Sequence, residues 1–334
     1  MNGSSVSSGD QRVDLAYVTS LYRSARFLPR FTEAALRHLA LLDQHGVSAE
    51  VVVVANEPSF LERRWLVDFE VRVAAAGAGR ARVLVGGREP LYASWNRGVH
   101  ATNSRCVGFW NCDDTRNAQA AIEGIRLIDG GARLAYFPYV RLETRWPFRL
   151  GWNFSVTHCP VPSYSHDKFQ DEMLAGPFFV AARNLFDDIG DFDERFRIAG
   201  DFDWCARAAA AGPLTRAEAV GGVYFQDGLG LSEGGDPRVA AEDDVVRLRQ
   251  GRYDSLVPAP ARLMREYRAL GLLDGVDIPD EIEAWLFRSS ADKNEAAEEW
   301  RRTRRRAHRQ QQRDELRRLV VGIVGRRNPG GRAP

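Results

Sequence analysis

The sequence contains almost no lysine. Lys168 and Lys293 are the only lysines among its 46 basic residues, and all other basic residues are arginine. Acidic residues balance them, which leaves a formal net charge of +1. Because so small a charge creates no strong overall field, composition indicates neither general nucleic-acid binding nor a preference for acidic partners.

Cysteine and long apolar runs are scarce as well. The four cysteines are Cys106, Cys112, Cys159 and Cys205. Their spacing predicts neither a zinc knuckle nor a disulfide framework, and fits reduced thiols. No run reaches the roughly 18 apolar residues of a membrane span, and the polar start MNGSSVSSGDQR lacks the apolar segment of a signal peptide. We expect a cytoplasmic protein with a disordered N-terminus over residues 1–12.

Strand-like and helix-like patterns alternate in the first half of the chain. Residues 13–22 form a short apolar run, and residues 25–46 place apolar side chains at helical spacing. Residues 49–59 begin with the β-branched run AEVVVVA, typical of a strand buried on both faces. Residues 89–102 indicate another helix and residues 105–114 a third strand. The alternation predicts an α/β fold with an open, doubly wound sheet.

Each of these strands ends in polar residues. The ends read TSLYRS, ANEPS and NCDD. Since such sheets bind ligands beyond the carboxyl ends of their strands, we expect all three to face one crevice. Asp113 and Asp114, in the last of them, have two interpretations. They either form a turn and cap the next helix, or they hold a divalent cation that bridges two phosphates.

The second half of the chain is mixed and then helical. Residues 200–212 predict a helix that ends at Gly212, and residues 236–290 indicate a helical extension. Residues 291–334 form a basic C-terminal helix and tail with a short apolar end. This tail either contacts the inner face of an anionic membrane or is a solvated or oligomerising helix. No nucleic-acid recognition module accompanies its arginines, so no nucleic-acid partner is expected.

Several segments, in order, resemble a family-2 glycosyltransferase with the GT-A fold. They are AYVTSLYRSARFLPRFTEAALRHL, AEVVVVANEPS, YASWNRGVHATNSRCVGFWNCDD, AGPFFVAARNLFDDIGDFDERF and GDFDWCARAAAAG. The resemblance covers about residues 13–232 and implies a domain over residues 13–235 with a mixed, doubly wound sheet. It further implies an inverting hexosyl- or related transferase of polysaccharide or glycoconjugate synthesis. A nucleotide sugar would be the donor, a saccharide, lipid-linked or other hydroxyl compound the acceptor, and Mg²⁺ or Mn²⁺ the cofactor.

The resemblance also assigns the donor and metal sites. The DxD motif of the family falls on Asn111, Cys112 and Asp113, so its first acid is an amide here. Asp113 is expected to bind the cation, with Asp114 in support. Other donor contacts are expected at Thr19, Asn56, Glu57, Asn96, Arg97 and Asn111. For Asn96 and Arg97, a helix C-cap with Gly98 is an equal alternative.

The acidic pair of the family falls on Gly200 and Asp201, so one acid is missing. The resemblance assigns Asp201 as the general base that takes the proton of the acceptor hydroxyl. The alternative is a helix N-cap. Asp203 and Arg207, four residues apart, are expected to form an ion pair on this helix.

Two rival functions stay open. A nucleotidyltransferase would share the nucleotide-binding sheet, but its glycine-rich phosphate loop is absent after the first strand. A non-catalytic nucleotide-sugar-binding descendant is suggested by Asn111, by Gly200 and by the lack of the family's late metal-binding histidine. Gln226 or Asp227, in YFQDGLGLS, would have to replace that histidine.

Overall fold

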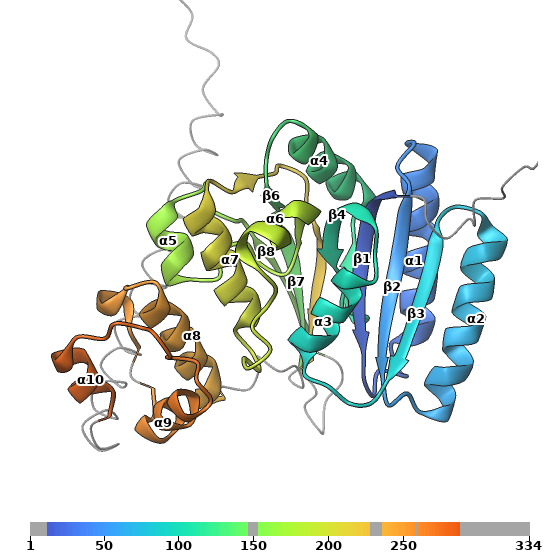
Figure 1. Cartoon of the computed structure of the whole chain (residues 1–334). Coiled ribbons are helices and arrows are strands. Elements are labelled where there is room, and N and C mark those ends of the chain that lie inside the picture. The colour runs from blue at the N-terminus through green and yellow to red at the C-terminus, as the bar shows by residue number, and fades with distance from the viewer. Residues whose placement is uncertain (1–11, 146–152, 228–235, 258, 288–334) are drawn as a thin grey trace, which may run out of the picture.

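A seven-stranded mixed sheet forms the centre of the protein (Figure 1). The computed structural model describes residues 12–145, 153–227, 236–257 and 259–287. The strand order is β10-β6-β9-β4-β1-β2-β3. The strands are β1 (Val13–Leu21), β2 (Ala49–Asn56), β3 (Arg80–Gly86), β4 (Ser104–Phe109), β6 (Leu134–Tyr136), β9 (Phe179–Ala182) and β10 (Thr215–Arg216). Only β9 is antiparallel to its neighbours in this sheet. The predicted α/β class with a doubly wound, mixed sheet is confirmed.

Helices cover both faces of this sheet, which explains the continuous apolar run in β2. They are α1 (Leu28–Gln44), α2 (Phe60–Ala76), α3 (Leu91–His100), α4 (Ala118–Asp129), α5 (His166–Asp171), α6 (Arg183–Ile189) and α7 (Gly200–Ala211). Val51 and Val53 pack in the core shared with α1, α2 and α4, whereas Val52 and Val54 pack in the core shared with α3, α6 and α7. A strand buried on both faces needs apolar residues at every position.

One strand of the first half was missed by the sequence analysis. β3 lies at the edge of the sheet, beside β2. Its side chains are mostly half-buried, and Arg80 and Arg82 interrupt its apolar residues. An edge strand needs less apolar surface than a central one, so the residues around it gave no strand signal.

A smaller second sheet extends the end of β4. Its order is β5-β11-β7-β8, with β5 (Thr115–Arg116), β11 (Gly222–Gln226), β7 (Tyr139–Arg145) and β8 (Asn153–Cys159). Val223 of β11 pairs with Thr115, directly after the NCDD segment. The second sheet therefore brings residues 222–227 next to Asp113 and Asp114.

The C-terminal helices share a core with the rest of the protein. They are α8 (Pro237–Arg249), α9 (Ala261–Ala269) and α10 (Asp280–Leu286), with a 3-10 turn over Tyr253–Ser255. Val245 of α8 and Met264 of α9 are fully buried in the same cluster as Trp204 of α7. The extension is therefore packed against α7 and the central sheet domain rather than set apart from it (Figure 1).

Some expectations concern residues outside the described part. The N-terminus over residues 1–12, apart from Arg12, and the basic tail over residues 291–334 lie outside it. All four cysteines lie within it and are free thiols. In the described ranges, no helix has the length and apolar character needed to cross a membrane.

Candidate active site

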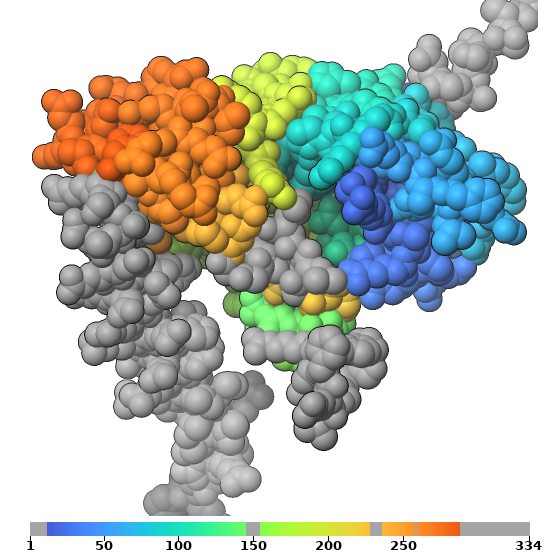
Figure 2. All heavy atoms as spheres, turned by 90° about the horizontal axis from the view of Figure 1, so that it is seen from below, coloured from blue at the N-terminus to red at the C-terminus, as the bar shows by residue number. Residues whose placement is uncertain are grey.

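A cavity of about 740 Å³ lies at the carboxyl ends of β1 and β2. Figure 2 looks onto this end of the molecule, with the blue and cyan first half on the right and the orange C-terminal helices on the left. The lining residues are Ser20, Tyr22, Ser24, Asn56, Arg88, Glu89, Pro90, Leu91, Glu194, Arg195, Phe196 and Arg197. The polar ends of the first two strands therefore meet in one crevice, as the sequence predicted.

Asn56 and Arg97 belong to one polar network beside this cavity. The buried amide of Asn56 donates from Nδ2 to Ser94 Oγ (2.7 Å) and accepts at Oδ1 from Arg97 Nη2 (3.3 Å). Arg97 also forms an ion pair with Glu89 (2.9 Å). Asn56 and Glu89 line the cavity, so Arg97 fixes two lining side chains from behind.

An aromatic ring with arginines beside it forms part of the cavity wall. The guanidinium carbon of Arg88 lies 4.9 Å from the ring centroid of Tyr22, and that of Arg23 lies 5.2 Å from it. Tyr22 and Arg88 both line the cavity. A ring can stack on a base or sugar, and arginine suits phosphate oxygens. The sequence analysis did not single out either residue, although Tyr22 lies within the polar end TSLYRS.

Of the six predicted donor-binding residues, five do not line the cavity and only Asn56 does. Arg97 lies behind two lining residues, and Asn111 contacts Asp114. Thr19 is buried within β1, and its hydroxyl has no hydrogen-bond partner. Glu57 is exposed and has a φ of 43°. Asn96 is buried and exchanges hydrogen bonds with the backbone of Phe192 (2.9 and 3.0 Å). Because α3 continues to His100, Asn96 is not its C-cap, and it connects this helix to the segment before α7.

Asp114 is held against β11. Its side chain is 3% exposed, and Oδ1 accepts a hydrogen bond from the Phe225 N–H (2.9 Å). Asn111 Nδ2 donates to Asp114 Oδ2 (3.4 Å). Burial, together with the charge of Asp113, raises the pKa of Asp114 to about 8. Asp114 thus has a structural role. The predicted helix cap was wrong, because the N-cap of α4 is Asn117, whose side chain accepts from the Gln119 N–H.

Asp113 lies in a more open position, with a second carboxylate near it. Burial raises the pKa of Asp113, and the negative charge of Asp227 raises it further. Asp227 follows β11 and pairs with Arg26 (2.5 Å), while Arg30 donates to the Asp113 carbonyl oxygen. Asp227 is one of the two residues that the sequence analysis suggested as a replacement for the late histidine. The structure brings it toward Asp113.

This position adjoins the cavity through the side chain of Ser24. Ser24 lines the cavity and forms a hydrogen bond with Cys112, directly before Asp113. Among the described residues, no group of three or more His, Cys, Asp or Glu side chains converges on one point. Two carboxylates fit Mg²⁺ or Mn²⁺, because these ions commonly take their other oxygens from phosphates and water.

Asp201 lies in the first turn of α7 and is held from two sides. Its Oδ1 accepts from the Phe202 N–H (2.9 Å) and from the Tyr92 hydroxyl of α3 (3.1 Å). Burial raises the pKa of Asp201 to about 6, although these hydrogen bonds oppose the shift. The N-cap residue of α7 is Ala199, so Asp201 is not the cap of this helix. A carboxylate with a pKa near neutrality suits proton abstraction.

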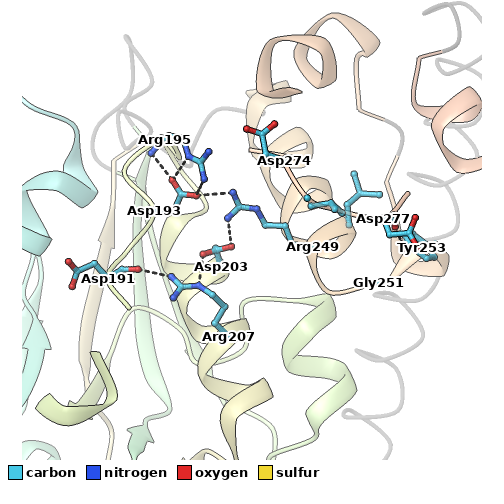
Figure 3. A pocket seen from close by; sticks show the side chains of 13 residues that line it. Asp191, Asp193, Arg195, Asp203, Arg207, Arg249, Gly251, Tyr253, Asp274 and Asp277 are labelled. Carbon is cyan, nitrogen blue, oxygen red and sulfur yellow. Dashed lines mark hydrogen bonds and ion pairs between the residues drawn. The ribbon is translucent and has the colours of Figure 1, made fainter. Parts of the chain in front are cut away.

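The predicted pair of Asp203 and Arg207 is present, and a further arginine joins it. Asp203 accepts from Arg207 Nε (2.9 Å) and from Arg249 Nη1 of α8 (2.8 Å). Arg249 also binds Asp193 (2.8 Å), beside a second cavity of about 600 Å³ (Figure 3). Asp203 is therefore fully engaged in ion pairs on the side of α7 that faces the C-terminal helices.

No known protein-family profile matches the sequence, and no curated protein matches it. Among solved structures, TarS 1-349 of S. aureus in complex with UDP-GlcNAc is similar, at 12% identity and a TM-score of 0.50, over 82% of this chain and 78% of that chain. A longer TarS structure has 12% identity and a TM-score of 0.50, over 81% of this chain and 50% of that chain.

The fold is of the GT-A type. The fold implied by the sequence resemblance is thus confirmed, and it is the fold of a glycosyltransferase. Similarity at 12% identity reaches no further than the fold. Membership of family 2 stays a prediction.

Proposed function

We propose that this protein is a glycosyltransferase that moves a sugar from a nucleotide sugar to an acceptor hydroxyl, with inversion. One observation carries the proposal: the carboxylate of Asp201, with a pKa raised to about 6, lies four residues after the segment 194–197 that lines the cavity, although Asp201 is not itself a lining residue. A short stretch of chain thus connects a candidate base with a ligand-sized cavity at the carboxyl ends of the strands.

The donor would occupy the cavity near β1 and β2. Its volume of about 740 Å³ lies within the usual range for small-molecule sites. Tyr22 would stack on the base or ribose, and Arg88 would face the phosphates. The TarS structure of the same fold was solved with UDP-GlcNAc, which supports a nucleoside diphosphate sugar as the donor class.

Asp113 is the residue that we expect to hold a divalent cation. Asp227 would be the second carboxylate, and Asp114 would keep the NCDD segment in place through Phe225. When bound, the cation would supply positive charge to the departing nucleoside diphosphate. Arg26 and Arg30, which contact Asp227 and the Asp113 backbone, add permanent positive charge at the same place.

The acceptor would approach from the α7 side of the cavity. Asp201 would take the proton of the acceptor hydroxyl while its oxygen attacks the anomeric carbon. The bond from that carbon to the nucleoside diphosphate breaks at the same time, and a single displacement of this kind inverts the anomeric centre. Tyr92 would hold Asp201 in position through its hydrogen bond.

A binding screen paired with a turnover assay tests this proposal. Thermal shifts would be recorded with UDP, GDP, UTP, GTP, UDP-GlcNAc, UDP-glucose and GDP-mannose, each with and without Mn²⁺. A ligand at 100 times its Kd stabilises the native state by about 2.7 kcal/mol. Release of UDP or GDP from the nucleotide sugars, and of pyrophosphate from the triphosphates, would be measured in parallel.

The outcomes separate the candidate functions. Binding with release of the nucleoside diphosphate supports a transferase. Binding without release, for every acceptor tried, favours a non-catalytic nucleotide-sugar-binding protein. Selective binding of nucleoside triphosphates, with release of pyrophosphate, favours a nucleotidyltransferase, and no binding of any nucleotide contradicts all three.

A further inference from the structure

The segment before α7 is held by a buried carboxylate of α8. Glu242 is 0% exposed, and its Oε2 accepts hydrogen bonds from the backbone N–H groups of Arg197 (3.1 Å), Ile198 (2.7 Å) and Ala199 (2.8 Å). Its Oε1 accepts from the hydroxyl of Tyr267 in α9 (3.0 Å). Both carboxylate oxygens are therefore used, and all their donors lie in segments distant in sequence.

This contact supplies an acceptor that the N-cap residue of α7 lacks. The N-cap residue, Ala199, has no side-chain acceptor. Backbone N–H groups at the start of a helix have no partners within the helix, and a negative charge there is favourable. Glu242, from a different helix, provides an acceptor for the Ala199 N–H and a negative charge beside the helix start, and it also binds the N–H groups of Arg197 and Ile198, which precede α7.

Asp201 lies two residues after the anchored N–H groups. On its other side, the Tyr92 hydroxyl lies within hydrogen-bond reach of both the Ile198 carbonyl oxygen and Asp201 Oδ1. The segment 197–201 is thus held between Glu242 of α8 and Tyr92 of α3. A shift of the first contact would move Asp201 relative to the cavity.

A second residue of α8 holds the same region. Arg249 donates to Asp193 Oδ2 (2.8 Å) and to Asp203 Oδ1 (2.8 Å), which lie on either side of Asp201 in the chain (Figure 3). Glu242 and Arg249 therefore attach α8 to the residues before and after Asp201. The C-terminal helices contact the candidate base region directly through these side chains.

We propose that Glu242 is a positioning residue that sets the place of Asp201 through the backbone of residues 197–199. This inference rests on the proposed function, in which Asp201 is the general base. It makes the C-terminal helices a required part of the catalytic unit. It also implies that the C-terminal helices cannot be removed without loss of transfer.

The charge of Glu242 should affect a second measurable quantity, the pKa of Asp201. The titratable groups that face Asp201 are Tyr92 of α3, Glu242 of α8 and Cys205 of α7. The negative charge of Glu242 raises the pKa of Asp201, after the larger effect of burial. A neutral residue at 242 should therefore lower the pKa of the base, which a purely structural role would leave unchanged.

The test compares Glu242→Gln and Glu242→Ala with Glu123→Gln. Glu123 of α4 is a matched control, because it also accepts from two backbone N–H groups, those of Glu218 and Ala219 (both 2.9 Å), in a loop that lines neither cavity described above. Hydrogen exchange of the amides of residues 197–199 would be followed in each variant. If the alanine variant does not fold, the glutamine variant carries the test alone.

Turnover is followed as UDP release from UDP-GlcNAc, or from whichever nucleotide sugar the wild-type protein uses. We expect amides 197–199 to exchange at least about tenfold faster in Glu242→Ala, since they lose their acceptor. In Glu242→Gln, kcat should fall about 10- to 100-fold with KM little changed, because small displacements of a catalytic group cost rate. In the profile of kcat against pH, the acidic limb of Glu242→Gln should lie at lower pH than that of the wild-type protein. Unchanged exchange, or a loss of kcat no larger than in Glu123→Gln, would overturn the inference.

Failure of the proposed function is detected separately. If the wild-type protein releases no nucleoside diphosphate from any nucleotide sugar, the transferase proposal fails. Two measurements need no substrate. One is the pKa of Asp201, obtained by following its carboxyl ¹³C NMR signal as the pH is changed, and the other is hydrogen exchange of amides 197–199. A lower titration midpoint of Asp201 in Glu242→Gln, together with faster exchange in Glu242→Ala, would still show that Glu242 sets the place and charge state of Asp201. An unchanged titration midpoint would refute the inference.

Discussion

Gly200 lies directly against the ring of Tyr92. A Cβ added at Gly200 would be 2.6 Å from both Cδ2 and Cε2 of that ring, and Tyr92 is 1% exposed. The position where the sequence resemblance places the first acid of a pair therefore has no room for a side chain. Tyr92 occupies this space and donates a hydrogen bond to Asp201.

The first prediction concerns this contact. Gly200→Ala should lower the free energy of unfolding by about 1–3 kcal/mol, because it overpacks a buried ring. An ordinary glycine-to-alanine change in a helix instead raises the free energy of unfolding by about 1 kcal/mol. The sign of the change therefore tells whether Gly200→Ala overpacks the ring. Urea denaturation measures it, with Gly87→Ala as the control, since a Cβ at Gly87 meets no atom within 4 Å. Stabilisation by Gly200→Ala would show that the ring can yield.

The second prediction separates the two acids of α7. Asp201→Asn should keep nucleotide-sugar affinity but lose about 10² to 10⁴ in transfer rate, which is the usual contribution of a general base. Asp203→Asn should mainly lower stability, because Asp203 pairs with Arg207 and Arg249. Titration calorimetry and initial rates measure both variants. Near-normal turnover in Asp201→Asn would assign the base elsewhere.

The third prediction concerns pH. The transfer rate should rise as pH increases through about 6, because Asp201 must lose its proton to act as a base. The hydrogen bond from Tyr92 lowers the pKa of Asp201, so Tyr92→Phe should move this limb to higher pH. Glu242→Gln should move it in the opposite direction. Profiles of kcat against pH for the three proteins measure the shifts, and coincident limbs would exclude Asp201 as the titrating group.

The fourth prediction concerns the cation. Asp113→Ala should abolish the part of nucleotide binding that depends on Mn²⁺, because Asp113 is the proposed ligand. Asp114→Asn should preserve that part, because Asp114 is already bound to the Phe225 N–H. The exposed Asp187, which pairs with Arg183, provides the control variant Asp187→Ala. Titration calorimetry with UDP, with and without Mn²⁺, measures the difference. Equal affinity of wild type and Asp113→Ala in Mn²⁺ would refute the metal site.

The fifth prediction links Asp114 to stability. Its folded pKa of about 8 lies above the unfolded value of about 3.9. The folded state therefore holds the proton more tightly, and the free energy of unfolding should fall as pH rises from about 4 to about 8. Asp114→Asn, which resembles the protonated form, should reduce this slope. Urea denaturation at several pH values between 4 and 8 tests it, and an unchanged slope would mean that Asp114 stays ionised in the folded protein.

The sequence was sufficient for the main elements of the fold. The β-branched run of β2 and the helical spacing in α1 are local patterns, and each is decided by which faces of one element are buried. The polar ends of β1 and β2 could be placed in one crevice because parallel strands end at the same edge. The edge strand β3, with its alternating arginines, carried too weak a local pattern to be recognised.

The roles within the candidate site depended on contacts between distant segments. Asp113 and Asp114 are neighbours in sequence, yet only Asp114 meets the Phe225 N–H, 111 residues away. Glu242 lies among the buried residues of α8. An acidic residue among buried positions was the one sign in the sequence of a special role, but the sequence does not tell which groups it contacts. Local periodicity reports which side of a strand or helix is buried, and so the sequence determined the elements and their order. Only the packing of those elements decides which polar groups meet, and so the tertiary structure distinguished Asp113 from Asp114 and linked α8 to Asp201.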